Sequence, residues 1–469
     1  MKYAQTKNSV RVHAVDSTWA DGLRGIASIF IVSSHITLCF CRSIVPPSQG
    51  YDGPVALFQR PILRLIGQGN AFVAVFFVLL GYVNSLKAIS LSRTGSIPDA
   101  LSNLASSSFR RSGRLIFPAA ACTLISWFLC QIGFFDFARR SDAYWLQVTT
   151  PVPSASWGQA VYDLAHELVY TWIYKENRYD QPQWALAHLF KGSMYIFMVL
   201  LATINATPAF RLSAEVILYI WSWLSNDSIV LINVFAGMVL AELSFYLKPT
   251  SPSRLTSPIP YLSALLGLYL CSYPDSFAEQ TPWSRQLLEL GQRIFPQGAM
   301  MGRYWPGLGA QILCFSVLNS PSMRKALSSP VLKWLGGLSY PIYLLHGMVM
   351  RSLMAWLTFG PVAISASLHQ QTHQQQELAD HQQPASFTNT TDLIPQPSPF
   401  VILIALPLFF AALLALASSW AKHVEPIFAQ TTVRFERFAR TLGGGGGVGA
   451  RKGLDDDEPR KEKRLLLPL

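Results

Sequence analysis

Arg24 and His35 are the two residues whose types and spacing suggest chemistry most directly. His35 follows Arg24 by eleven positions, close to three helical turns, so both side chains face the same side of a helix. At about 1.5 Å per residue, His35 lies roughly 16 Å farther along the axis than Arg24. A histidine at that depth of an apolar helix either serves a function or bonds a neighbouring helix. Arg24 stands at the helix mouth, where Asp21 can pair with it.

Long apolar helices must position these residues. Hydrophobic residues make up 51% of the 469-residue chain and charged residues 13%, whereas soluble domains carry about 25% charged residues. A membrane-spanning helix needs about 20 apolar residues. The apolar stretches lie near 25–42, 71–89, 115–135, 186–205, 209–225, 228–247, 259–274, 306–320, 334–357 and 400–422. The sequence therefore predicts an all-α fold, a polytopic membrane helix bundle with about ten transmembrane helices.

The net charge of +11 does not indicate nucleic-acid binding, because the basic residues cluster beside apolar stretches, where they set membrane orientation. These clusters are the N-terminus, Arg110 to Arg114, Lys248 with Arg254, Arg324 to Lys333, and the chain after Lys422. With ten spans they share one side, so we expect both termini in the cytosol. We expect a cytosolic segment 1–20, a transmembrane domain 21–425 containing a flexible lumenal loop 358–399, and a cytosolic juxtamembrane segment with a disordered tail, 426–469. The protein would lie in the endomembrane system, with the endoplasmic reticulum favoured, or in the plasma membrane.

The loop 358–399 is rich in histidine and glutamine, and such low-complexity sequence does not build a core. A metal site formed by His369, His373 and His381 is the alternative to a solvated loop. We favour the solvated loop and therefore predict no metal. Asn389 begins a glycosylation sequon on the expected lumenal side. The six cysteines lack metal-site spacing, and we expect them to be unpaired packing residues.

Asp21-Gly-Leu-Arg24-Gly followed by His35 resembles the start of the acyltransferase-3 family of membrane acyltransferases, particularly its fungal members. Further similar motifs follow in order over residues 17–440. They are Phe76 to Tyr82, Arg111-Ser-Gly-Arg114-Leu with Pro118, Trp184 to Ser193, Phe235-Ala-Gly237-Met, and Leu338 to Gly347. One departure is Leu189, which stands where many fungal members have glutamate. His188 or Glu167 would replace that carboxylate, or the site is altered or inactive.

The resemblance implies transfer of an acyl group, commonly acetyl, from a CoA thioester to a hydroxyl group. It makes His35 the general base, with a covalent acyl-histidine as the alternative. Arg24 would guide the CoA at the cytosolic opening. Arg111 and Arg114 would clamp its phosphates, unless they serve only as orientation charges.

Lys191 and His346 are further candidates, with a helix-packing role for His346 as the alternative. No bound cofactor is implied, and acyl-CoA, commonly acetyl-CoA, is the co-substrate. The other expected partners are the lipid bilayer and a small-molecule hydroxyl acceptor. A fungal secondary metabolite is favoured over a glycan or a lipid. Two readings of another class stay open: a proton-coupled transporter and a catalytically inactive membrane scaffold.

Overall fold

The computed structural model describes residues 16–247, 258–363 and 393–442. Within these ranges the chain folds into helices and connecting loops, and its one β-bridge is the isolated pairing of Ser141 with Ile394. The prediction of an all-α fold is confirmed for this part of the chain. Several residues named in the sequence analysis lie outside the described residues. They are His369, His373, His381, Asn389, Lys248, Arg254 and the glycine-rich tail.

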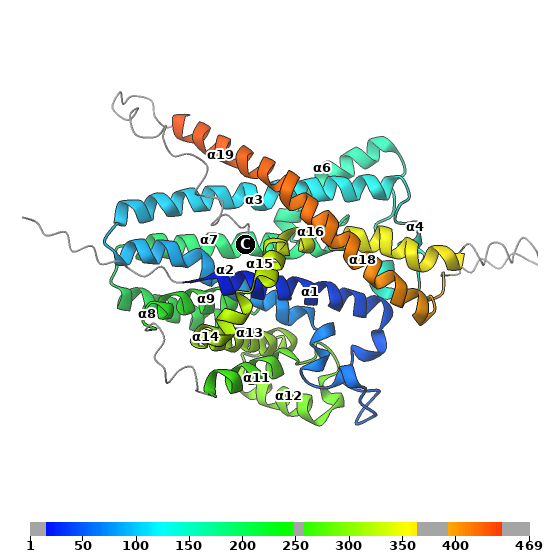
Figure 1. The fold of residues 1–469 in the computed structure, drawn as a ribbon, viewed down its shortest axis with the longest axis horizontal. Helices are drawn as coiled ribbons and strands as arrows, with labels where there is room; N and C mark the ends of the chain where they lie inside the picture. Colours follow the sequence, from blue (N-terminus) through cyan, green and yellow to red (C-terminus); the bar gives the residue numbers. More distant parts are fainter. Residues whose placement is uncertain (1–15, 248–257, 364–392, 443–469) are drawn as a thin grey trace, which may run out of the picture.

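Each predicted apolar stretch corresponds to a helix in the described residues. These helices are α1 (Thr18–Phe40), α2 (Gly69–Arg93), α3 (Ile97–Gln131), α7 (Trp184–Thr203), α8 (Pro208–Leu224), α9 (Leu231–Ser244), α11 (Ile259–Cys271), α13 (Met301–Asn319), α16 (Ser339–Val349) and α18 (Pro399–Ser419). Helices α1, α2, α3 and α7 run side by side along the long axis of the molecule (Figure 1).

Six helices of the described ranges are long and apolar enough to cross a membrane. They cover Thr18–Phe40, Gly69–Arg93, Ile97–Gln131, Gln181–Thr203, Ser339–Ala363 and Pro399–Thr441. Helices α9 and α11 are apolar but shorter, and α8 carries the buried charges of Arg211 and Glu215. An integral membrane protein is therefore indicated, whereas the count of ten spans and the cytosolic termini stay predictions.

Glycines let neighbouring helices approach until their backbones touch. A Cβ on Gly81 of α2 would lie 2.1 Å from the carbonyl oxygen of Val234 on α9. In the same way, a Cβ on Gly237 of α9 would lie 2.1 Å from the carbonyl oxygen of Val78 on α2. Both glycines belong to the sequence motifs noted above. These motif positions therefore serve helix packing, which depends on close backbone approach in membranes.

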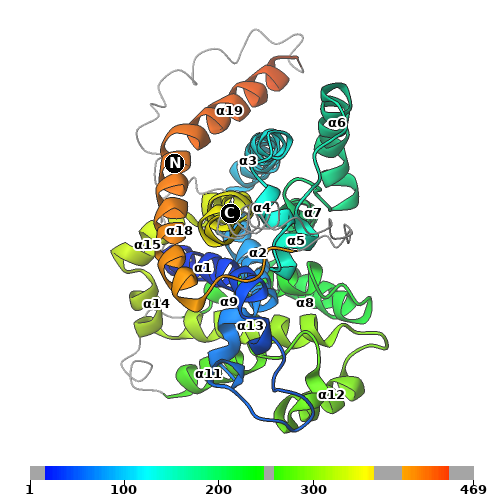
Figure 2. The same ribbon diagram turned by 90° about the vertical axis from the view of Figure 1, so that its right-hand side faces the viewer.

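Six further helices lie in the connections between the apolar stretches, and the last of them overlaps the start of the stretch 334–357. They are α4 (Asp136–Arg139), α5 (Tyr144–Thr149), α6 (Trp157–Tyr174), α12 (Pro282–Ile294), α14 (Pro321–Leu327) and α15 (Pro330–Gly337). Figure 2 shows α6 and α12 at the margins of the bundle. The first four of these helices lie in the connections near 136–185 and 275–303, where the sequence analysis found no apolar stretch, so they are a finding of the structure.

The predicted juxtamembrane segment continues α18 as a helix. A π-helical turn, Trp420–Val424, connects α18 to α19 (Glu425–Leu442). Glu436 of α19 pairs with Arg110 of α3 at 2.6 Å, so α19 packs along the polar first half of α3. All six cysteines are unpaired and five of them are buried, as expected.

Candidate active site

His35 of α1 and His346 of α16 form a hydrogen-bonded pair. Nδ1 of His35 lies 3.2 Å from Nε2 of His346, and the second nitrogen of His346, Nδ1, lies 2.6 Å from the carbonyl oxygen of Tyr343. A carbonyl oxygen only accepts hydrogen bonds, so Nδ1 of His346 carries the proton. Nε2 of a neutral His346 then accepts the N–H of His35 Nδ1. This arrangement leaves the lone pair of His35 on its Nε2 atom.

The exposure of the two histidines differs. His346 is fully buried, whereas His35 is only half-buried. Within the described residues, no group forms a hydrogen bond to Nε2 of His35. His35 is therefore the member of the pair that can meet a substrate, and His346 is the member that orients it.

The ring of Trp145 packs against His35 on one side and against Arg351 on the other. The ring of Trp145, on the short helix α5, lies 4.4 Å from the His35 ring, centre to centre. The guanidinium of Arg351 lies 5.4 Å from the centre of the Trp145 ring. Arg351 belongs to the π-helical turn Met350–Met354 that follows α16, and such turns occur frequently at functional sites.

Arg351 forms a buried ion pair with Asp180. The two side chains are fully buried, with Nη1 of Arg351 3.3 Å from Oδ1 of Asp180. Gln183 donates to Oδ2 of the same carboxylate at 3.0 Å. A Cβ on Gly347 would lie 2.7 Å from Oδ1, so only glycine leaves room for Asp180 at this position. Nε and Nη2 of Arg351 are buried and have no hydrogen-bond partner among the described residues.

Asp180 is held by the loop between α6 and α7. The side-chain oxygen of Asn177 accepts the backbone N–H of Asp180 at 2.7 Å, which folds the loop back on itself. Glu167 of α6 accepts the backbone N–H of Arg178 at 2.8 Å, and burial raises the pKa of this carboxyl. Glu167 thus supports the loop, and within the described residues it forms no hydrogen bond to His35.

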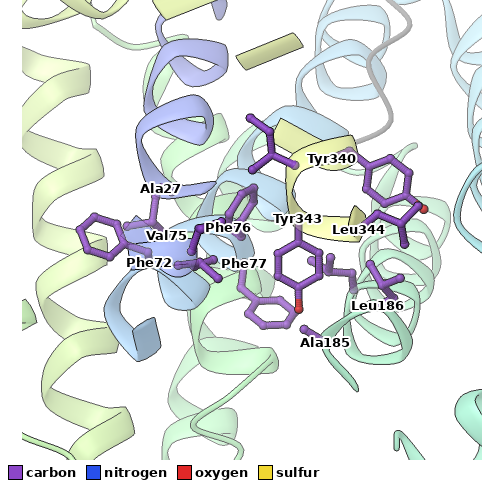
Figure 3. Packing of buried hydrophobic residues seen from close by; sticks show 14 of the residues in the cluster. Ala27, Phe72, Val75, Phe76, Phe77, Ala185, Leu186, Tyr340, Tyr343 and Leu344 are labelled. Carbon is purple, nitrogen blue, oxygen red and sulfur yellow. The ribbon is translucent and has the colours of Figure 1, made fainter. Parts of the chain in front are cut away.

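A small apolar cavity of about 10 Å³ lies one helical turn from the histidine pair. It is lined by Ile31, four positions before His35, and by Tyr343, three positions before His346. The remaining walls come from α2 and α7 and comprise Val73, Phe76, Phe77, Ala185 and Leu189. Figure 3 shows the Tyr343 ring beside Phe77 and Ala185. Leu189, which departs from the fungal pattern, therefore forms part of an apolar wall near the candidate site.

Arginines gather toward the other end of α1. Arg24 is buried and pairs with Asp21 at 2.5 Å. Arg111 of α3 donates to the hydroxyl of Ser193 at 3.0 Å and interacts electrostatically with Arg24 and Arg114. The structure thus brings the three predicted arginines together. It does not place Arg24 in contact with His35, which lies about three turns away.

The remaining candidates lie apart from both groups. Lys191 pairs with Asp227 at 3.2 Å, in the connection between α8 and α9. The ring of His188 packs edge-on to Trp184 at 5.6 Å. In the part of the chain that the structure describes, neither side chain forms a hydrogen bond, ion pair or ring contact with the histidine pair or with the three arginines. Their role as cofactor-binding or site residues stays a prediction.

Sequence reasoning missed Arg351 and Asp180. Arg351 had a usable signal, since it is an arginine five positions after His346 inside an apolar stretch, where charged residues are costly and usually functional. Asp180 had none, because it lies in a polar loop among other charged residues. Only the fold shows that this loop turns inward.

Comparison with known proteins extends these observations. A family model described as an acyltransferase domain matches residues 17–417. The chain is 26% identical to acyltransferase R4 of a Phoma species and to acyltransferase clz18 of Cochliobolus lunatus, in each case covering 74% of this chain and 84% of the relative. It is also 26% identical to O-acetyltransferase PaAT-1 of Phomopsis amygdali, covering 72% of this chain and 73% of that protein. No solved structure matches.

Proposed function

The chain belongs to the acyltransferase-3 family, and we propose that it transfers an acyl group from acyl-CoA to a hydroxyl group of a small molecule. The observation that carries this proposal is the histidine pair, in which His346 accepts from Nδ1 of the half-buried His35 and so leaves the lone pair of His35 on its Nε2 atom. A general base needs such a lone pair within reach of the acceptor proton.

In the proposed reaction, one proton transfer to His35 accompanies the acyl transfer, and a second proton transfer from His35 completes it. Nε2 of His35 takes the proton of the acceptor hydroxyl as its oxygen attacks the thioester carbonyl carbon. The new C–O bond forms, the C–S bond breaks, and the imidazolium returns the proton to the leaving CoA thiolate. During the charged stage, His346 keeps its hydrogen bond to Nδ1–H of His35 and so stabilises the imidazolium.

Arg351 suits the negative charge that develops on the thioester oxygen. Its Nε and Nη2 atoms are buried donors with no described partner, beside the Trp145 ring that packs against His35. Donors fixed in advance in a site of low polarity are the most effective stabilisers of an oxyanion. Asp180 balances the guanidinium charge and fixes its orientation.

The arginine cluster suits the phosphates of CoA. Arg24, Arg111 and Arg114 concentrate positive charge at the end of α1 remote from His35. We propose that the cluster opens to the cytosol, with ten helices crossing the membrane and both termini cytosolic. The thioester then extends inward toward His35, past the level of Ile31. The orientation is supported by the basic residues that flank the apolar stretches.

The acceptor class is proposed from the name of a relative and from the family resemblance. One relative is named an O-acetyltransferase, which favours a hydroxyl acceptor. A secondary metabolite remains the favoured acceptor class, with a glycan or lipid as the alternative. Fold and family do not identify the acceptor, since one fold serves many substrates.

A proton-coupled transporter is the second candidate function. It is favoured by two neighbouring pairs of titratable groups, His35 with His346 and Arg351 with Asp180, because such groups also carry protons through membranes. Cleavage of a thioester separates the two, since a carrier does not break that bond.

The test uses the full-length protein purified in detergent and acetyl-CoA with water or a simple alcohol as acceptor. We expect release of the CoA thiol, followed with a thiol reagent, at a rate above that of protein-free detergent. The same protein in sealed vesicles should show no uptake of protons driven by a gradient. Proton uptake without thiol release would contradict the proposal and support the transporter.

A further inference from the structure

We propose that α19 is an interfacial helix whose outward face binds anionic lipid headgroups at the membrane surface where α18 ends. This assigns an interaction surface to α19 and a lipid partner to that surface. The assignment does not depend on acyl transfer.

The first argument is the position of α19, which begins where an apolar helix ends. α18 is 21 residues long, enough to cross the hydrocarbon core of a bilayer. The π-helical turn that follows exposes Lys422, and basic residues are typical of a membrane boundary. Figure 1 shows α19 continuing from α18 and running obliquely over α3. The first turns of α19 therefore lie at the bilayer surface.

The inward face of α19 is occupied by contacts with α3. A Cβ on Gly113 of α3 would collide with the hydroxyl group of Thr432, so the two helices touch at this point. One turn farther along α19, Glu436 pairs with Arg110 at 2.6 Å. These contacts fix the rotation of α19 about its own axis, and they thereby fix which of its residues face outward.

The outward face combines large apolar side chains with arginines. Ile427, Phe435 and Phe438 expose 60%, 54% and 60% of their surfaces. Arg434 and Arg437 are also exposed, and among the described residues neither side chain forms a hydrogen bond or an ion pair. Positions 427, 434 and 438 are separated by seven and four residues, so their side chains form one line along the helix.

This combination matches the boundary between lipid headgroups and acyl chains. The apolar side chains enter the acyl region, while the long arginine side chains extend back to the phosphates. Each arginine near an anionic surface favours binding about fivefold. A symmetric dimer through the same face would instead bring Arg434 and Arg437 of two copies together, because Glu436 is turned toward α3. The charges therefore favour an anionic lipid surface as the occupant.

The experiment places a fluorescent probe on the outward face of the full-length protein. Gln430→Cys combined with Cys41→Ser provides one exposed thiol, since the other five cysteines are buried. The labelled protein is inserted into nanodiscs of phosphatidylcholine, alone or with about 30% phosphatidylserine, that contain nitroxide-labelled lipid. We expect the nitroxide to quench the probe, and to quench it more strongly when phosphatidylserine is present.

Two double variants identify the source of this effect. Arg434→Gln with Arg437→Gln should weaken lipid binding of α19 by about 25-fold, two factors of about fivefold, and so remove most of the phosphatidylserine-dependent quenching. The matched control, Arg60→Gln with Arg293→Gln, removes two exposed arginines outside α19 and should leave the quenching unchanged.

A probe that is not quenched in either bilayer would overturn the inference, because another partner would then cover the face. Quenching that is indifferent to phosphatidylserine, or equally reduced in both double variants, would also overturn it. None of these measurements involves acyl-CoA, so their failure would leave the proposed function intact.

Discussion

His346 accepts a hydrogen bond from His35 across the contact of α16 with α1, and the carbonyl oxygen of Tyr343 fixes which nitrogen of His346 does so. The relationship resembles the role of the aspartate in a catalytic triad, in which a buried acceptor holds a histidine in one tautomer. Here a neutral imidazole takes that role. The consequence is a base whose lone pair is directed by a partner that need not meet the substrate.

Replacement of His346 tests this role. His346→Phe removes the acceptor, so His35 no longer holds one tautomer, and we expect kcat to fall by about 100-fold or more. The KM for acyl-CoA should change little, because His346 is buried away from the arginine cluster. His346→Gln, whose side-chain oxygen can accept from Nδ1–H, should recover part of the rate. If kcat fell equally in His346→Phe and His346→Gln and the KM for acyl-CoA rose in both, His346 would have a packing role instead.

Because Arg351 and Asp180 form a buried ion pair, we expect removal of one charge to destabilise the protein more than removal of both. Asp180→Leu leaves a buried guanidinium without its counter-charge and should cost about 3–5 kcal/mol of stability. The double variant Asp180→Leu with Arg351→Met removes both charges and should regain most of the lost melting temperature without regaining activity. Thermal unfolding in detergent measures the stability of each variant, and thiol release measures its activity. Activity in a stable double variant would contradict the role of Arg351.

Two adjacent glycines of α15 offer a matched comparison. A Cβ on Gly336 would lie 2.1 Å from the carbonyl oxygen of Asp21, whereas a Cβ on Gly337 meets nothing within 4 Å. Gly336→Ala should therefore push α15 away from α1 and cost about 1–3 kcal/mol, and Gly337→Ala should be nearly neutral. Melting temperatures of the two variants check this. Similar values for both would show that α15 does not pack against α1 so closely.

Arg24 is predicted to act in donor binding. Arg24→Ala should raise the KM for acyl-CoA by about tenfold or more, because a charge-assisted contact to phosphate is lost. Raised salt should weaken donor binding by the wild-type protein more than by the variant. Arg293→Ala, on the exposed side of α12, is the control and should behave as wild type. An unchanged KM in Arg24→Ala would remove this arginine from the donor site.

Periodicity and composition predicted the helix that holds both Arg24 and His35, because a long apolar stretch has few alternatives to helix. They did not predict α5 or α6, since helices in polar connections depend on contacts made elsewhere in the fold. Trp145 is the clearest case. Nothing in its local sequence indicates that α5 places its ring against His35.

The candidate site was only partly predictable for a related reason. The spacing of Arg24 and His35 is local, so a helix alone fixes it. The contacts of His35 with His346 and of Arg351 with Asp180 join positions 311 and 171 residues apart. Such contacts follow from how α1, α16 and the loop before α7 pack together, which a single sequence does not contain.

The central claim is that Nε2 of His35 removes the acceptor proton, and the rate of CoA thiol release by His35→Gln tests it most directly. The comparison is with wild-type protein and with His423→Ala, an exposed histidine outside the site, at matched melting temperatures. The account predicts a rate at least about 100-fold below wild type for His35→Gln, with acyl-CoA affinity retained. A His35→Gln protein that releases thiol at the wild-type rate would contradict it.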